Sequence, residues 1–305
     1  MNRGTSDHRW PSAAEWLAAG PGARPVDLAV IGIPTFATSV PNTGAHATPA
    51  AVRRALDQLT TWSPSRGVDL SQLVAPWDRG DVDDPDVRVE GEWRVRTAVE
   101  TAAAKARLLV VIGGDNSLTY PAMAGVFGDD LGRAGLVTVD AHHDLREARS
   151  NGAPVRELIA AGLPGERIVQ VGIADWANSR SYATEAHARG VTVIGRGEVA
   201  ERGIAECMRE ALDVAAAGDA GAYVDLDLNA CDRAVAPACP ASLPGGLSAR
   251  EMLTAAFLAG ADPRVRAADI TEVDATQDAD DERTVRLAAM CLLEIAAGLA
   301  TRSDR

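Results

Sequence analysis

The chain has 305 residues, of which 47% are apolar, so it is long enough to bury a sizeable core within one large α/β domain. Its formal net charge is −13, with 43 acidic residues against 30 basic ones, and such a surface repels nucleic acid and anionic membranes. The four cysteines include no CxxC pair, which argues against a zinc ribbon or a thioredoxin-type motif.

Short apolar runs alternate along the chain with stretches rich in alanine, leucine, glutamate and arginine. The apolar runs, which we predict to be strands, occupy residues 26–33, 107–112, 134–139, 168–173, 191–194, 222–228 and 265–273. The helix-favouring stretches occupy residues 50–59, 93–106, 199–217, 249–259 and 284–300. Nearly continuous apolar strands that alternate with helices are typical of βαβ units around a parallel sheet.

We therefore predict a single α/β domain over residues 1–305, built as a three-layer αβα sandwich. Residues 1–24 are expected to be a loosely held N-terminal segment, and the Pro- and Asp-rich residues 76–86 a surface loop. The N-terminus lacks an apolar core of signal-peptide length, and no stretch reaches the length of a membrane span. These features predict a cytoplasmic protein that binds neither membrane nor nucleic acid.

Carboxylates and amides gather where the predicted strands end. Residues 140–144 read DAHHD, residues 225–227 read DLD, residues 113–117 read GGDNS, and Glu272 follows the last strand. The carboxyl ends of parallel strands meet at one edge of a sheet, so these groups are expected to converge there. That many carboxylates in one crevice repel each other, and a multivalent cation is the natural compensation.

The spacing within DAHHD and DLD also favours a metal site. Asp140, His142 and Asp144 alternate with other residues and share one side of an extended chain, as do Asp225 and Asp227. Four carboxylates and one imidazole suit two Mn²⁺ ions better than a thiol-rich zinc site. Two such ions can share a water and lower its pKa toward neutrality. Taken singly, either motif is also compatible with a solvated turn at a strand end.

These motifs, in this order, resemble the metal signatures of the ureohydrolase family, which includes arginases, agmatinases and formimidoylglutamases. Further similar segments are Gly32-Ile33-Pro34, Gly44-Ala45, Pro237, PGGL at residues 244–247 and DITEV at residues 269–273. The resemblance covers residues 26–300 and implies an arginase-like fold with a mainly parallel sheet and two Mn²⁺ ions per chain.

The resemblance also implies roles for individual residues. Asp140 and Asp225 would bridge the two ions; Asn116 and Asp144 would complete one site, and His142 and Asp227 the other. Asp144 would in addition accept the proton of the attacking water. Glu272 would face the amidinium group of the substrate.

Three positions depart from the common family pattern. Asn116 stands where the family usually has histidine, so that metal site is expected to bind less tightly, and a site with one ion or none stays open. Asn151 stands where arginases carry a proton-shuttling histidine, which argues against arginase itself. The segment from Asp225 to Pro237 is two residues longer than expected, which leaves the pocket wall at residues 229–233 undefined.

The expected substrate carries a carboxylate. Arg146 lies where arginases have an asparagine that contacts the substrate carboxylate, and Arg149 would extend a cationic rim. Arginine binds carboxylates through a two-pronged fork, although a surface ion pair is an equally good interpretation of Arg149. Asn151 completes the expected set of substrate-binding residues.

The predicted activity is therefore hydrolysis of N-formimidoyl-L-glutamate to L-glutamate and formamide, a step of histidine degradation. The alternatives are hydrolysis of N-hydroxyarginine, of a guanidino acid or of agmatine, or a metal-poor family member without activity. Arg146 counts against agmatine, which has no carboxylate. A homo-oligomer is compatible with the resemblance, although one sequence defines no interface.

Overall fold

A computed structural model describes residues 9–303 of the chain, and its centre is one sheet of eight strands. In spatial order these are β4 (Pro76–Asp81), β1 (Val26–Ile33), β5 (Ala106–Gly113), β10 (Val265–Thr271), β9 (Ala222–Asp227), β6 (Gly135–Val139), β7 (Ile168–Ile173) and β8 (Thr192–Gly195). All neighbouring strands in this sheet run parallel. A separate two-stranded antiparallel ribbon joins β2 (Trp62–Ser63) to β3 (Val68–Asp69).

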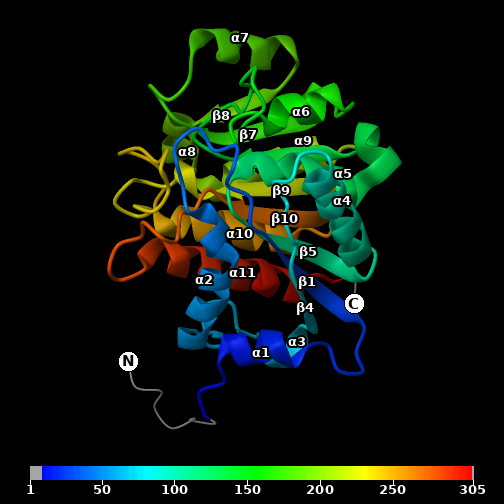
Figure 1. Cartoon of the computed structure of the whole chain (residues 1–305). Coiled ribbons are helices and arrows are strands. Elements are labelled where there is room, and N and C mark those ends of the chain that lie inside the picture. The colour runs from blue at the N-terminus through cyan, green and yellow to red at the C-terminus, as the bar shows by residue number, and fades with distance from the viewer. Residues whose placement is uncertain (1–8, 304–305) are drawn as a thin grey trace.

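The sheet is apolar on both faces, and each face is covered by helices. Successive side chains of a strand point to opposite faces, so Leu28 and Val30 of β1 enter one core cluster, whereas Ala29 and Ile31 enter the other. Burial on both sides explains why the strands read as continuous apolar runs. Three layers of helix, sheet and helix are the result (Figure 1), as predicted.

The helices divide between the two faces. Residues of α1 (Ala13–Ala19), α2 (Thr48–Ala55), α3 (Leu70–Leu73), α8 (Arg196–Arg202), α9 (Ile204–Ala215), α10 (Ala249–Ala261) and α11 (Arg283–Ala300) belong to the first cluster. Residues of α4 (Glu90–Ala103), α5 (Thr119–Phe127), α6 (Pro154–Ala160) and α7 (Arg180–Ala188) belong to the second. Figure 1 shows α1 and α3 at one end of the molecule, near β4, and α7 at the other end.

Three expectations differ from the structure. Residues 76–81, expected in a loop, form the edge strand β4, which has no neighbouring strand on its outer side and so tolerates a proline at its first position and two aspartates. The N-terminal segment carries helix α1, where Trp16 and Leu17 are buried; residues 1–8 of that segment lie outside the described residues. The long helix expected over residues 199–217 is split into α8 and α9 at Gly203, which has φ of 83°.

The described helices include none with the length and apolar character needed to cross a bilayer. The carboxyl ends of β5, β10, β9 and β6, together with the loops that follow them, carry the polar motifs singled out in the sequence. These four strands are consecutive neighbours in the sheet, so the fold brings residues 116, 140–144, 225–227 and 272 to one edge.

Candidate metal centre

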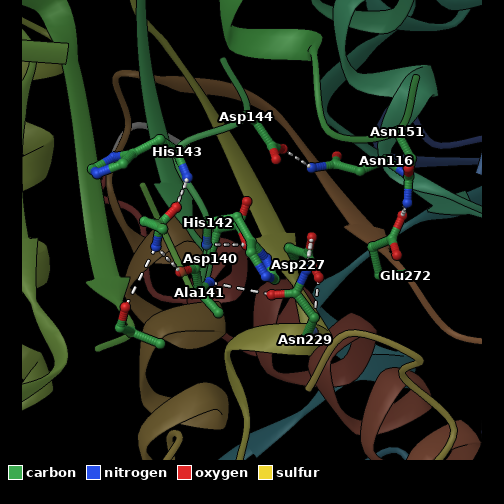
Figure 2. Close-up of polar contacts among 12 residues, drawn as sticks. Asn116, Asp140, Ala141, His142, His143, Asp144, Asn151, Asp227, Asn229 and Glu272 are labelled. Atoms are coloured by element: carbon green, nitrogen blue, oxygen red, sulfur yellow. Dashed lines mark hydrogen bonds and ion pairs between the residues drawn. The ribbon is translucent and has the colours of Figure 1, made fainter. Parts of the chain in front are cut away.

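Each of four neighbouring strands contributes polar side chains to one cluster (Figure 2). Asn116 follows β5, Glu272 follows β10, Asp225 and Asp227 end β9, and Asp140, His142 and Asp144 follow β6. Figure 2 shows Asn116, Asp140, His142, Asp144, Asp227 and Glu272 surrounding one space. Asp144 and Glu272 have positive φ values of 53° and 65°, a strained backbone conformation that recurs at functional sites of proteins.

The carboxylates of the cluster are buried close to one another. Burial raises the pKa of Asp144 well above its ordinary value, and the nearby charges of Asp140 and Glu272 raise it further. The pKa of Asp225 is raised in the same way, by burial and then by Asp269 and Asp140. Cations between these groups would remove the repulsion, so the electrostatics of the cluster fit a site for multivalent metal.

Asp140 offers a second indication of a missing partner. Its Oδ1 accepts the backbone N–H of His142 at 2.9 Å and lies 3.4 Å from Nδ1 of the same residue. Its Oδ2 is buried and has no hydrogen-bond partner among the described residues. Burial alone would lower the pKa of His142, but the contact with Asp140 outweighs it and raises this pKa. An orphaned carboxylate oxygen in a polar cluster suits a metal ligand.

Asn116 occupies the space between two carboxylates. Its Nδ2 donates to Asp144 Oδ2 at 2.8 Å and to Asp225 Oδ2 at 3.4 Å. In this arrangement no three His, Cys, Asp or Glu side chains of residues 9–303 already converge closely enough to hold an ion. A half-turn of the amide, which exchanges its nitrogen and oxygen, would present an oxygen ligand instead. The donor types fit Mn²⁺, and this half-turn would let Asn116 join them.

Glu272 is held in place by two donors to a single oxygen. Its Oε1 accepts the backbone N–H of Asn116 at 2.8 Å and Nδ2 of Asn151 at 2.9 Å. Burial, followed by the charge of Asp115, raises the pKa of Glu272 to about 7. Asn151 is itself fixed because its Oδ1 accepts the backbone N–H of Val40 at 3.0 Å. The residue expected to bind substrate thus touches Glu272, which lines the same pocket.

Asn229 is a site residue that the sequence did not reveal. Its backbone N–H donates to Asp227 Oδ1 at 2.7 Å and its Nδ2 to Asp227 Oδ2 at 2.6 Å. Its Oδ1 accepts the backbone N–H of Ala141 at 3.1 Å. Asn229 therefore ties the end of β9 to the DAHHD loop, and the undefined wall begins with this residue. The only signal was its position two residues after Asp227.

A pocket of about 280 Å³ opens over the cluster, with His142, Asp144, Asp227 and Glu272 among its lining residues. The side chain of Arg146 also lines it, together with residues 177–179 and Tyr182. Arg149 does not: its guanidinium pairs with Glu92 at 2.9 Å and with Glu157 at 3.6 Å. The structure thus separates the two arginines of the expected rim, because Arg149 has carboxylate partners on α4 and α6.

Comparison with known proteins places this geometry in a family. The family model described as the Arginase family matches residues 26–298. The chain belongs to the arginase family. The resemblance inferred from the motifs and the expected arginase-like fold are both confirmed.

Several family members that resemble the chain are formimidoylglutamases. The chain is 33% identical to that of Halalkalibacterium halodurans, over 97% of this chain and 95% of the relative. It is 30% identical to the formimidoylglutamase of Bacillus subtilis, over 89% of this chain and 86% of the relative. The crystal structure of the Bacillus subtilis enzyme superposes with a TM-score of 0.89 at 27% identity and covers 99% of this chain and 97% of that one. The crystal structure of a formiminoglutamase from Trypanosoma cruzi with Mn²⁺ superposes with a TM-score of 0.84 at 26% identity. It covers 96% of this chain and 99% of that one.

Proposed function

We propose that this arginase-family chain uses two Mn²⁺ ions to hydrolyse N-formimidoyl-L-glutamate to L-glutamate and formamide. The relatives that bear this activity in their names match nearly the whole chain. The cluster of oxygen donors with one imidazole suits manganese, and its buried carboxylates need compensating charge. Two bound ions supply positive charge that polarises a shared water and lowers its pKa.

The ligand roles follow the motifs. Asp140 and Asp225 would be shared by the two sites, Asn116 and Asp144 would complete one, and His142 and Asp227 would complete the other. Each side chain comes from a strand end at the same edge of the sheet, and the buried Oδ2 of Asp140 is free to accept a second contact. Asn229 keeps Asp227 in place through both carboxylate oxygens.

Two residues of this centre position the substrate and transfer the proton. Glu272 holds the amidinium so that its carbon faces the water, a positioning role. Asp144 accepts the proton that the water loses when its oxygen bonds to that carbon. The same proton passes to the glutamate nitrogen as the bond between carbon and this nitrogen breaks. Formamide and glutamate leave, and Asp144 is regenerated as a carboxylate.

The side chain of Arg146 is the observation that supports an acidic substrate. It lines the pocket beside the cluster, and among the described residues it has no hydrogen-bond or ion-pair partner for its guanidinium. A guanidinium in this position is available to a carboxylate of the substrate through paired hydrogen bonds. Both carboxylates of N-formimidoyl-L-glutamate lie on the glutamate side, opposite the amidine held by Glu272.

A substrate panel with added Mn²⁺ tests the proposal directly. The panel contains N-formimidoyl-L-glutamate, arginine, N-hydroxyarginine, guanidinobutyrate and agmatine, with products identified by chromatography. We expect kcat/KM to be highest for N-formimidoyl-L-glutamate and glutamate to appear in step with formamide. Turnover of agmatine alone would overturn the role of Arg146, and preference for a guanidino acid would move the assignment to another branch of the family.

The rival from a different class is a family member that binds little metal and catalyses nothing, which Asn116 favours. Manganese content after dialysis separates the two: about two ions per chain supports the enzyme, and none supports the rival. A cytoplasmic location and a homo-oligomeric assembly stay predictions, the latter open to a test by light scattering.

A further inference from the structure

A series of buried polar side chains leads from Asn116 to Asp269, whose charge also raises the pKa of Asp225. Thr119, in the first turn of α5, places its Oγ1 at 2.6 Å from Asn116 Oδ1 and at 2.7 Å from Asp269 Oδ2. Asp269 on β10 also accepts the hydroxyl of Tyr223, on β9, at 2.9 Å. All four side chains are fully buried. None of the steps proposed above uses Thr119, Asp269 or Tyr223.

In the present orientation of the Asn116 amide, and with Asp269 as a carboxylate, these side chains have too few hydrogens for their short contacts. A threonine hydroxyl carries one hydrogen, and a carboxylate only accepts. With Oδ1 of Asn116 facing Thr119, that single hydrogen has two acceptors, Asn116 Oδ1 and Asp269 Oδ2, at almost equal distances. One of these two short contacts then lacks a hydrogen.

A half-turn of the amide fits the hydrogens to the acceptors. Nδ2 of Asn116 then donates to Thr119 Oγ1, and the Thr119 hydroxyl donates to Asp269 Oδ2. The second amide hydrogen faces Thr271 Oγ1, which lies 3.4 Å from the same amide atom. The half-turn also places the amide oxygen where Nδ2 now lies, 2.8 Å from Asp144 Oδ2 and 3.4 Å from Asp225 Oδ2. Oxygens that meet in this way need either a proton or a metal cation between them.

We propose that Thr119 and Asp269 are positioning residues that turn the amide oxygen of Asn116 toward the metal centre. The proposal rests on the two-metal function above. It explains what orients Asn116, the ligand expected to bind most weakly. An asparagine needs such a device because its two ends have nearly the same shape, whereas only the oxygen binds a cation. Without the hydroxyl of Thr119, the amide nitrogen keeps its two carboxylate acceptors and blocks the site.

The test compares Mn²⁺ binding by calorimetric titration in Thr119→Val and Thr119→Ser. We expect Thr119→Val to weaken the weaker of the two sites by about tenfold to a hundredfold, the range usual for partners of metal ligands. Thr119→Ser keeps the hydroxyl and should stay within about threefold of the wild type. Thr138→Val is a matched control, since the buried Thr138 hydroxyl has no partner among the described residues.

Repeating Thr119→Val in an Asn116→Asp variant distinguishes an effect on the orientation of the side chain at position 116 from an effect on packing. Asp at position 116 presents an oxygen at both ends, so Asn116→Asp makes the orientation of the group irrelevant. Thr119→Val should then cost less than about threefold in Mn²⁺ affinity, compared with tenfold or more beside Asn116. An equal loss in both backgrounds would mean that Thr119 acts only through packing, and the proposal would be wrong.

Asp269→Asn provides an independent variant should Thr119→Val fold poorly, as judged by its circular dichroism melt. The new amide can donate to Thr119 Oγ1, so that the Thr119 hydroxyl donates to Asn116 Oδ1 instead. This predicts a similar loss of Mn²⁺ affinity at the weaker site. Unchanged binding of two ions by Asp269→Asn would overturn the inference and leave the proposed activity intact. A wild-type protein that binds no Mn²⁺ would overturn both, and one that binds two ions without hydrolysing any amidine would overturn only the activity.

Discussion

Asp144 combines features that are seldom found together in one residue. It adopts a left-handed backbone conformation, it is buried, and its carboxylate lines the pocket beside Glu272. Its own turn is secured because its backbone carbonyl accepts the N–H of Arg156 on α6 at 3.2 Å. This hydrogen bond to α6 helps to hold Asp144 in its strained conformation.

Asp144→Asn is expected to lower kcat by at least about a hundredfold, because it removes a metal charge and the proton carrier together. Asn116→His should be mild by comparison, since imidazole is a competent ligand for the same ion. Steady-state rates at saturating Mn²⁺, with the metal content counted by atomic emission, make the comparison. Near-normal kcat in Asp144→Asn with two ions bound would assign the proton transfer to another group.

Arg146→Gln is expected to lower kcat/KM for N-formimidoyl-L-glutamate by roughly ten- to a hundredfold, mainly through a higher KM. A charge-assisted hydrogen bond contributes about 1.5–3 kcal/mol, which corresponds to that range. Arg149→Gln is the matched control: its guanidinium is half exposed and paired with Glu92, so its loss should change kcat/KM by less than about twofold. Equal effects in the two variants would remove the distinction between these arginines.

The sequence predicted that the polar motifs converge, because alternation in a strand and the meeting of strand ends are rules that need no tertiary contact. Asp140, His142, Asp225 and Asp227 lie at one edge of the sheet as expected, and their role as ligands stays a prediction. The contacts of Asn151 and Asn229 were not, because an amide can donate to any nearby carboxylate and its sequence position does not say to which. Arg149 was placed in the rim because its partner on α4 lies 57 residues away in the chain.

At the scale of elements, the strands were easier to predict than the helices. Buried parallel strands are continuous apolar runs, and the seven predicted ones match observed strands to within about two residues. Helices α1, α3, α5, α6 and α7 escaped prediction because each has at most nine residues, too few for a clear helical pattern. The edge strand β4 escaped because its outer side needs no apolar residues, so its sequence, PWDRGD, reads as a turn.

The contact between α10 and α11 depends on glycine, which allows the two backbones to approach closely. A Cβ at Gly260 would lie 2.0 Å from the carbonyl oxygen of Ile295, and one at Gly298 would lie 2.2 Å from that of Phe257. Gly260→Ala should therefore force the helices apart and lower the free energy of unfolding by about 1–3 kcal/mol. Urea unfolding followed by circular dichroism measures the change.

Gly197, in α8, is the control for this prediction. A Cβ there meets no atom within 4 Å, and its backbone is helical, so Gly197→Ala should leave stability unchanged or raise it by up to about 1 kcal/mol. If both variants changed stability alike, the close approach of α10 and α11 would not be the cause.

At the scale of the whole molecule, the cluster links metal, protons and stability. In the metal-free protein, burial raises the pKa of Asp269 to about 6 and that of Glu272 to about 7, and it raises the pKa values of Asp144, Asp225 and Asp227 well above 3.8. The folded chain therefore keeps protons that the unfolded chain releases. Stability contributed by such groups is present at low pH and is lost as pH rises from about 4 through these folded-state values.

Bound Mn²⁺ replaces those protons as the compensating charge, so its stabilising effect should grow with pH. We expect the difference in melting temperature between protein with excess Mn²⁺ and protein with a chelator to be small near pH 5 and several degrees larger near pH 8. Taking the difference at each pH cancels the titration of groups outside the cluster. Asp227→Asn removes one of the buried acids and should flatten the pH dependence of the chelator-treated protein. A gap that stayed constant from pH 5 to pH 8 would show that these carboxylates are already ionised without metal, and the electrostatic account of the cluster would be wrong.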